Sequence, residues 1–212
     1  MTPLTTRTRL VAYCAVGIYS VGLLVYGVTV PSGLARAISF LPAVLAVSFA
    51  FFEADLWRRR PFAWIIKRPY LEGTWRGTLT SYRRDAQDTP SSSDHPIVLV
   101  VRQSFSTTVV TLLTSESRSQ SRISELSEEP NGQWLLQYQY LNHPAMSARD
   151  RGSTIHAGSA IAQVAHGRPT RLEGEYWTAR DTRGTYDAVL LSRRRVSTFE
   201  EGETLMSEIG AH

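Results

Sequence analysis

The sequence predicts a two-helix transmembrane hairpin followed by an all-β domain, an eight-stranded up-and-down antiparallel barrel. Two observations lead to this fold class. Two long apolar runs lie near the N-terminus, at residues 10–30 and 34–52. After Leu71 the chain instead alternates apolar and polar residues at period two, which is typical of strands with one buried face. We therefore expect a membrane anchor that carries a β domain.

The first apolar run is long enough to span a bilayer. Residues 10–30 contain no charged residue, and a helix of this length extends about 30 Å, the thickness of a hydrocarbon core. Pro31, Ser32 and Gly33 interrupt the pattern, and residues 34–52 follow with Arg36 as their one charge. A secretory signal would have a shorter apolar core, of about 7 to 15 residues. Two buried helices of a soluble protein are the other alternative, but charge-free helices of this length are more typical of membrane spans.

The charges that flank the two runs predict their orientation. Arg7 and Arg9 precede the first run, and five basic residues lie within residues 58–68, after the second. Because positive charge favours the cytoplasmic side, we expect both termini and the β domain in the cytoplasm. Trp57 and Trp64 are interleaved with the basic residues, a pattern that suits contact with anionic membrane lipid.

Charge and composition exclude several functions. Residues 1–70 have a net charge of +6 and residues 71–212 a net charge of −2, so the β domain has no positive field for polymeric nucleic acid. The single cysteine, Cys14, lies in the first apolar run and leaves the β domain without disulfides. The five histidines lack metal-ligand spacing, and no phosphate-loop, Rossmann or nucleophile-elbow motif is present. We expect no enzymatic activity, metal or cofactor.

The period-two segments predict consecutive strands, because short turn motifs such as Pro130-Asn131-Gly132 separate several of them. Two longer polar segments, 83–96 and 143–153, and the tail after Val196 are predicted to be disordered. The expected domains are a hairpin with its basic flank at 1–68, a barrel at 69–195 and a polar tail at 196–212. The predicted strands are 73–82, 97–104, 107–113, 119–128, 133–142, 155–165, 170–179 and 184–194.

Alternation within these strands predicts which side chains line the barrel, since alternate residues point inward. One face of 133–142 carries Tyr138 and Tyr140, and one face of 170–179 carries Tyr176 and leads to Arg180 at the rim. Tyrosine rings can stack on bases, an arginine can bind phosphate, and hydroxyls and amides can bind base edges and sugars. This combination favours a small nucleotide as ligand. The candidate binding residues are Gln103, Ser117, Ser119, Tyr138, Tyr140, Asn142, His156, Tyr176, Thr178 and Arg180.

Each candidate also has a structural interpretation. Tyr138 and Tyr140 could be ordinary half-buried strand residues, Arg180 a solvated turn residue, and His156 a hydrogen-bonded strand residue. Trp75, near the start of the first strand, is predicted to plug one end of the barrel.

Several short motifs, in this order behind a membrane hairpin, resemble those of the two-transmembrane β-barrel effectors of CBASS, the cyclic-oligonucleotide-based anti-phage signalling system. The motifs are Gly73-Thr74-Trp75-Arg76-Gly77, the strand that ends in Gln103, the Ser117/Ser119/Ser121 run, Leu136-x-Tyr138-x-Tyr140-x-Asn142-x-Pro144, His156-x-Gly158 and Gly174-x-Tyr176-Trp177-Thr178-x-Arg180-x-Thr182-x-Gly184. The resemblance implies a lipocalin-like barrel whose activating ligand is a cyclic dinucleotide made by a cGAS/DncV-like nucleotidyltransferase. It further implies that the hairpins self-associate, disrupt the inner membrane and kill the infected cell.

Three other functions stay open at this point. A membrane-tethered, lipocalin-like carrier of an apolar molecule predicts a mostly aliphatic inner face, which the tyrosine faces oppose. A non-enzymatic membrane scaffold predicts a filled barrel without a ligand. An unrecognised hydrolase is the last alternative.

Overall fold

The computed structural model describes residues 17, 21–22, 33–84 and 90–210. It divides the chain into two compact units. The first comprises residues 1–66 together with 104–106, and the second comprises residues 67–103 and 107–212. Most of the first predicted helix, residues 10–30, lies outside the described residues.

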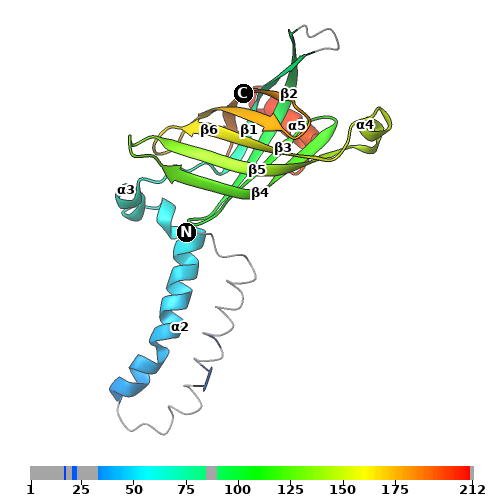
Figure 1. Cartoon of the computed structure of the whole chain (residues 1–212). Helices are drawn as coiled ribbons and strands as arrows, with labels where there is room; N and C mark the ends of the chain where they lie inside the picture. The colour runs from blue at the N-terminus through cyan, green and yellow to red at the C-terminus, as the bar shows by residue number, and fades with distance from the viewer. Residues whose placement is uncertain (1–16, 18–20, 23–32, 85–89, 211–212) are drawn as a thin grey trace. The chain divides into compact units, whose positions relative to one another are not determined.

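In the first unit, the described residues from 33 onward form one long helix and two short ones, which Figure 1 shows as α2, η1 and α3. Helix α2 spans Gly33–Ala54, η1 spans Leu56–Arg58 and α3 spans Phe62–Ile66. The second apolar run is therefore helical. Within the described residues, no helix is both long and apolar enough to cross a membrane. The transmembrane hairpin stays a prediction.

The buried carboxylate of Glu53 joins α2 to residues 104–106 within this unit. Glu53 Oε1, near the end of α2, accepts hydrogen bonds from Ser104 Oγ at 2.6 Å and from Ser106 Oγ at 2.7 Å and N at 3.1 Å. Phe105 N donates to the Glu53 carbonyl oxygen at 3.0 Å. The Phe105 ring packs edge-on against Phe52, with ring centroids 4.9 Å apart. Residues 104–106 are thus fixed to the end of α2 by both polar and aromatic contacts.

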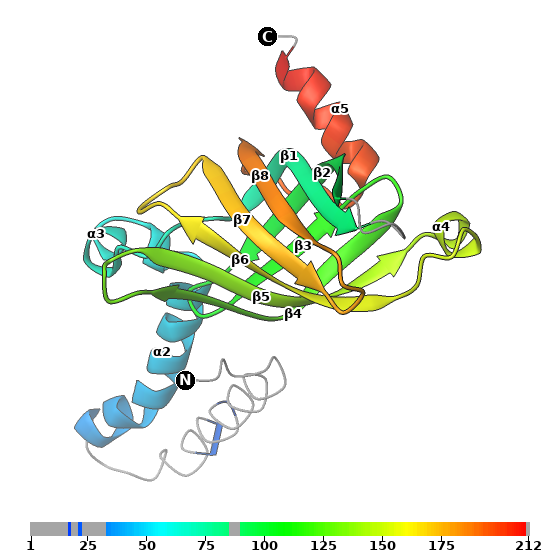
Figure 2. The ribbon, with the colours of Figure 1, turned by 45° about the horizontal axis from the view of Figure 1, so that its top comes forward.

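The second unit is a closed barrel in which each strand pairs with its sequence neighbours and β8 pairs with β1 (Figure 2). All pairs are antiparallel. The predicted eight-stranded up-and-down barrel is confirmed. Its strands are β1 Gly73–Arg84, β2 Pro90–Gln103, β3 Thr108–Leu113, β4 Ser117–Glu128, β5 Trp134–Pro144, β6 His156–Val164, β7 Arg171–Thr178 and β8 Arg183–Ser192.

Two segments that were predicted to be disordered contain regular structure. β1 and β2 continue through most of residues 83–96, with pairing that extends to Arg84 opposite Pro90; residues 85–89 lie outside the described residues. The residues of this extension are mostly polar and exposed, so ladder hydrogen bonds form it and no hydrophobic pattern marks it. Within 143–153, helix α4 spans Met146–Asp150, and Arg151 pairs with Glu116 at 2.5 Å.

The prediction of a disordered C-terminal tail is wrong as well. Helix α5 spans Phe199–Gly210 and packs on the outside of the barrel beside β2 (Figure 1). Buried Leu205 and Val196 contact the outward-facing Val98 and Val100. A Cβ atom on Gly202 would lie only 2.6 Å from Val98 Cγ2, so the glycine permits the close approach. The apolar side chains on the outer face of β2 pack against α5, and this packing stabilises the helix.

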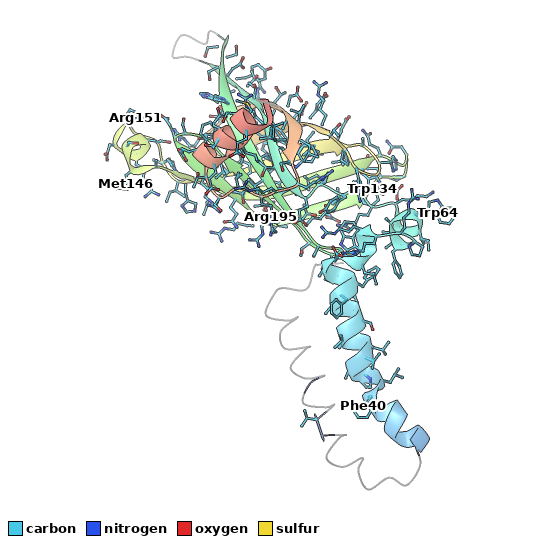
Figure 3. The ribbon with its side chains drawn as sticks, turned by 180° about the vertical axis from the view of Figure 1, so that it is seen from behind. Phe40, Trp64, Trp134, Met146, Arg151 and Arg195 are labelled. Carbon is cyan, nitrogen blue, oxygen red and sulfur yellow. The ribbon has the colours of Figure 1, made fainter. Side chains whose placement is uncertain are left out.

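The two ends of the barrel differ in composition. We call the end that carries residues 67–72 the linker end, and the opposite end, which carries α4 and the turns 114–116 and 179–182, the far end. Figure 3 shows Trp134 and Arg151 at these opposite ends. Trp75 is fully buried toward the linker end, and its Nε1 donates to the Leu71 carbonyl oxygen at 2.9 Å. Leu71 and Leu172 are also fully buried, so Trp75 plugs this end, as predicted.

Candidate functional site

The inner faces of the strands follow the predicted alternation. On β5, Tyr138 is buried and Tyr140 half-buried, whereas Gln137 and Gln139 between them are exposed. On β7, Tyr176 is buried while its neighbours Glu175 and Trp177 are exposed. The tyrosines of both strands therefore point into the barrel.

Four tyrosines from three strands meet toward the far end, where they enclose a small cavity of about 40 Å³. Tyr138 and Tyr140 come from β5, Tyr176 from β7 and Tyr186 from β8. The full lining is Leu79, Val110, Leu112, Ser119, Tyr138, Tyr140, Ala160, Tyr176 and Tyr186. The interior thus changes from aliphatic and tryptophan side chains at the linker end to tyrosines in the far half, which we call the tyrosine pocket.

Two hydrogen bonds hold the hydroxyls of Tyr138, Tyr176 and Tyr186. Tyr138 Oη donates to Tyr186 Oη at 3.5 Å, and Tyr176 Oη shares a hydrogen bond with Ser81 Oγ of β1. Burial raises the pKa of Tyr138 and of Tyr140 well above the ordinary value for tyrosine. Burial also raises the pKa of Tyr186 to about 12. At neutral pH these hydroxyls are uncharged, so each can both donate and accept a hydrogen bond.

Of the other predicted residues in this half of the barrel, Ser119 lines the cavity, and the rest lie farther toward the far end. Ser119 Oγ donates to Asn142 Oδ1 at 2.9 Å, and Asn142 lies opposite His156 in the sheet. His156 Nδ1 is 2.9 Å from the Thr154 carbonyl oxygen. Thr178 Oγ1 accepts a hydrogen bond from Arg180 N at 3.2 Å. Arg180 itself is exposed in the turn between β7 and β8, where its guanidinium can reach an anion from solvent.

Two predicted residues lie apart from this group. Gln103 is buried at the linker end, where its amide accepts from Leu71 N at 2.7 Å and donates to the Pro69 carbonyl oxygen at 2.9 Å. Its side chain therefore fixes the linker to the barrel. Ser117 is the first residue of β4, directly after the turn 114–116, and its Oγ lies 3.1 Å from Thr114 Oγ1.

Tyr186, which lines the tyrosine pocket, and Ser81, which is hydrogen-bonded to Tyr176, were not among the predicted binding residues. Tyr186 lies between Gly184 and Ala188 on the inward face of β8, and Ser81 lies on the inward face of β1. Both obey the same alternation of inward and outward side chains that predicted Tyr138 and Tyr176. The same alternation, applied to the first and last strands, would therefore have predicted Ser81 and Tyr186 as inward residues. Among the described residues no group of three or more histidines, cysteines, aspartates or glutamates could hold a metal ion.

Comparison with known families identifies the barrel. Residues 66–193, more than half of the chain, match the family model described as Cap15, cyclic dinucleotide receptor domain. The chain belongs to the Cap15 family. The Cap15 match begins at the linker and ends just after β8, so it covers every strand and leaves α2 and α5 outside. It confirms the predicted relationship to CBASS effectors with a cyclic dinucleotide receptor domain. No curated protein matches the chain.

Proposed function

We propose that this Cap15-family protein is a membrane-anchored effector of anti-phage defence whose tyrosine pocket binds the cyclic dinucleotide. The observation that carries the proposal is the clustering of Tyr138, Tyr140, Tyr176 and Tyr186 toward one end of a barrel that belongs to a cyclic dinucleotide receptor family. The protein acts as a receptor and not as an enzyme, and its only small-molecule requirement is this ligand.

The pocket supplies each interaction that a cyclic dinucleotide requires. Stacking of a base on an aromatic ring contributes about 1–3 kcal/mol. The uncharged tyrosine hydroxyls, with Ser119 and Asn142, can bind base edges and ribose hydroxyls. Arg180 at the rim can form a charged hydrogen bond with a phosphate. A carrier of apolar molecules would gain nothing from these polar groups.

Ligand entry requires the pocket to open. The enclosed cavity of about 40 Å³ is far smaller than the roughly 300–1,000 Å³ of typical small-molecule sites. Binding therefore displaces side chains at the far end, and the hydrogen bond between Ser81 and Tyr176 is one that must break. A ligand that binds only the opened barrel shifts the population toward that state.

The opened, ligand-bound barrel then causes the membrane to be disrupted. The two N-terminal apolar runs anchor the chain in the inner membrane, with both termini in the cytoplasm, where a cGAS/DncV-like nucleotidyltransferase releases the ligand. Self-association of liganded barrels raises the effective concentration of the attached hairpins. Hairpin assembly through close helix packing then disrupts the membrane and kills the infected cell. The charge-free length of residues 10–30 and the basic flank at 58–68 support this arrangement.

Calorimetry on the full-length protein in detergent, with a panel of 3′,3′-cyclic dinucleotides that covers all pairs of the four RNA bases, tests the proposal. We expect at least one member to bind, and Tyr176→Ala to weaken its binding by about 1–3 kcal/mol. Gln137→Ala, on the exposed face of β5, is the matched control and should bind like wild type. In reconstituted vesicles, the bound nucleotide should induce crosslinked oligomers and dye leakage. Leakage that is independent of nucleotide, or a panel without any ligand, would refute the proposal.

A further inference from the structure

Three of the four pocket tyrosines lie directly opposite a glycine on the neighbouring strand. Tyr140 of β5 pairs with Gly158 of β6. Tyr176 of β7 pairs with Gly184 of β8, and Tyr186 of β8 pairs with Gly174 of β7. Cross-strand partners point to the same side of the sheet, so each glycine leaves its inward position vacant next to a tyrosine ring.

The rings occupy these vacant positions. A Cβ atom on Gly158 would lie 2.4 Å from both Cζ and Oη of Tyr140. A Cβ on Gly174 would lie 2.5 Å from Tyr186 Cζ, and one on Gly184 would lie 2.8 Å from Tyr176 Cε1. Carbon atoms in contact are normally about 3.5–4.0 Å apart. Atoms of each tyrosine side chain therefore lie in the space that a side chain at the glycine would fill.

Tyr138 provides an internal contrast. It pairs with Ala160, whose methyl group already occupies the inward position. Its ring is tilted by 48° from that of Tyr140, with centroids 6.1 Å apart. Only the tyrosines opposite glycines can lie against the barrel wall.

A ring that rests on the wall has two consequences for a ligand. A ring whose atoms lie at the wall leaves its remaining surface to the interior, where a base can stack on it. The ring also takes up little of the width of the barrel. A side chain at the glycine would push the ring inward, narrow the pocket and tilt the stacking surface.

We propose that Gly158, Gly174 and Gly184 are positioning residues for the cyclic dinucleotide, which act by leaving space at the barrel wall for the rings of Tyr140, Tyr186 and Tyr176. This inference rests on the proposed binding of the ligand in the tyrosine pocket. Tyrosine rings placed in this way favour a ligand with two planar bases that can stack on them. Aromatic rings also stabilise glycines in sheets without any ligand, so the test must separate binding from folding.

Gly158 is the most suitable of the three for substitution. Its two nearest neighbours are side-chain atoms of Tyr140, and the nearest backbone atom, the Trp177 carbonyl oxygen, would lie 2.9 Å from a Cβ there. A Cβ at Gly184 would instead meet the Thr80 carbonyl oxygen at 1.9 Å and disturb the backbone far more. Ser159→Ala, at the next position of β6, is the control. The experiment measures binding of the tightest nucleotide of the panel to full-length Gly158→Ala, Tyr140→Ala and the double variant. Thermal melting of each variant is recorded in parallel.

We expect Gly158→Ala to weaken binding about tenfold, with Ser159→Ala unchanged. In the Tyr140→Ala background the same glycine substitution should cause no further loss, because the ring on which it acts is gone. A glycine needed only for the backbone would cause the same loss in both backgrounds, and that result would overturn the inference. If Gly158→Ala does not fold, Gly174→Ala with Tyr186→Ala forms the equivalent cycle.

The outcomes also separate this inference from the proposed function. Wild-type protein that binds no member of the panel overturns both. Binding that Tyr140→Ala leaves unchanged also overturns both, since the pocket is then not the site. Binding that Tyr140→Ala weakens and Gly158→Ala does not affect overturns the positioning role alone.

Discussion

At the scale of single residues, burial of the tyrosine hydroxyls makes the stability of the barrel depend on alkaline pH. The pKa of Tyr186 is raised to about 12 by burial, whereas an unfolded tyrosine titrates near about 10. Between these values the unfolded chain loses the proton and the folded chain keeps it. The stabilisation is therefore complete below about pH 10 and is lost as the pH rises through the folded pKa.

We predict that, between about pH 10 and the folded pKa of about 12, Tyr186 makes the free energy of unfolding fall by about 1.4 kcal/mol per pH unit. Urea unfolding, followed by tryptophan fluorescence at a series of alkaline pH values, measures this slope. Tyr186→Phe, which cannot ionise, should reduce the slope. An equal slope in wild type and variant would show that Tyr186 does not contribute.

Arg180 allows ligand binding to be tested apart from folding. Its side chain is exposed in the β7–β8 turn, so Arg180→Ala removes no packing. If the guanidinium makes a charged hydrogen bond to a phosphate, the substitution should weaken cyclic dinucleotide binding by about 1.5–3 kcal/mol. Calorimetry measures the affinity, and the melting temperature should stay the same. Unchanged affinity would remove Arg180 from the site.

Strand alternation could predict which residues face inward but not how far along the barrel they lie. Tyr138, Tyr140 and Tyr176 reach one cavity because their strands bring them to the same level. Gln103 satisfies the same alternation, yet it lies at the linker end. The level of a residue depends on the register between strands, and turn lengths and bulges such as the one between Ser121 and Ile123 set that register.

At the scale of elements, helix α5 depends on one small residue at its contact with the barrel. Gly202→Leu would place a side chain where Val98 already lies and should destabilise the barrel by about 1–3 kcal/mol. Leu205→Ala should cost about 2–5 kcal/mol, because Leu205 is buried in the same cluster. Glu208→Ala, on the exposed side of α5, is the control. Thermal melts would contradict the packing if all three variants matched wild type.

Glu53 is expected to hold residues 104–106 in place. Glu53→Ala leaves the Ser106 amide and the Ser104 and Ser106 hydroxyls without their acceptor, at a cost of about 1–3 kcal/mol. Faster hydrogen exchange of the Ser106 amide should report this loss. Glu53→Gln retains an oxygen acceptor and should exchange more slowly than Glu53→Ala. Equal protection in wild type and Glu53→Ala would show that backbone contacts alone fix the segment.

The eight strands could be predicted because each buries one face, and burial imposes the period-two pattern. The missed elements lack that pattern. The β1–β2 extension is mostly polar, and α5 buries little besides Leu205 and Gly202, so neither has an apolar stripe of ordinary width. Both are stabilised by contact with strands that are distant in sequence, which local patterns do not reveal.

At the scale of the whole molecule, sequence and structure divide the chain in the same region. Along the sequence, the first compact unit gives way to the second between residues 66 and 67, and the Cap15 match begins at residue 66. Residues 1–70 have a net charge of +6, and residues 71–212 have a net charge of −2. The family identity could be reached from short motifs because they mark inward tyrosines, glycines and turns whose order the barrel fixes.

This division predicts separable functions for the two parts. Deletion of residues 1–68 should leave cyclic dinucleotide binding intact and abolish toxicity, because the proposed function assigns ligand sensing to the barrel and membrane disruption to the hairpin. Arg180→Ala in the full chain should insert normally and stay harmless. Two helices alone cannot enclose a conduit, whereas many hairpins that are gathered by liganded barrels can.

Co-expression with a cognate nucleotide synthase tests this division. Full-length protein, the barrel fragment and Arg180→Ala are compared by dye uptake of the cells and by crosslinking of the protein. Only the full-length protein should form oligomers and permeabilise the membrane, and only when the synthase is active. Lysis by the barrel fragment would place the lethal activity outside the hairpin. Oligomers and leakage without the synthase would show that the nucleotide does not control assembly.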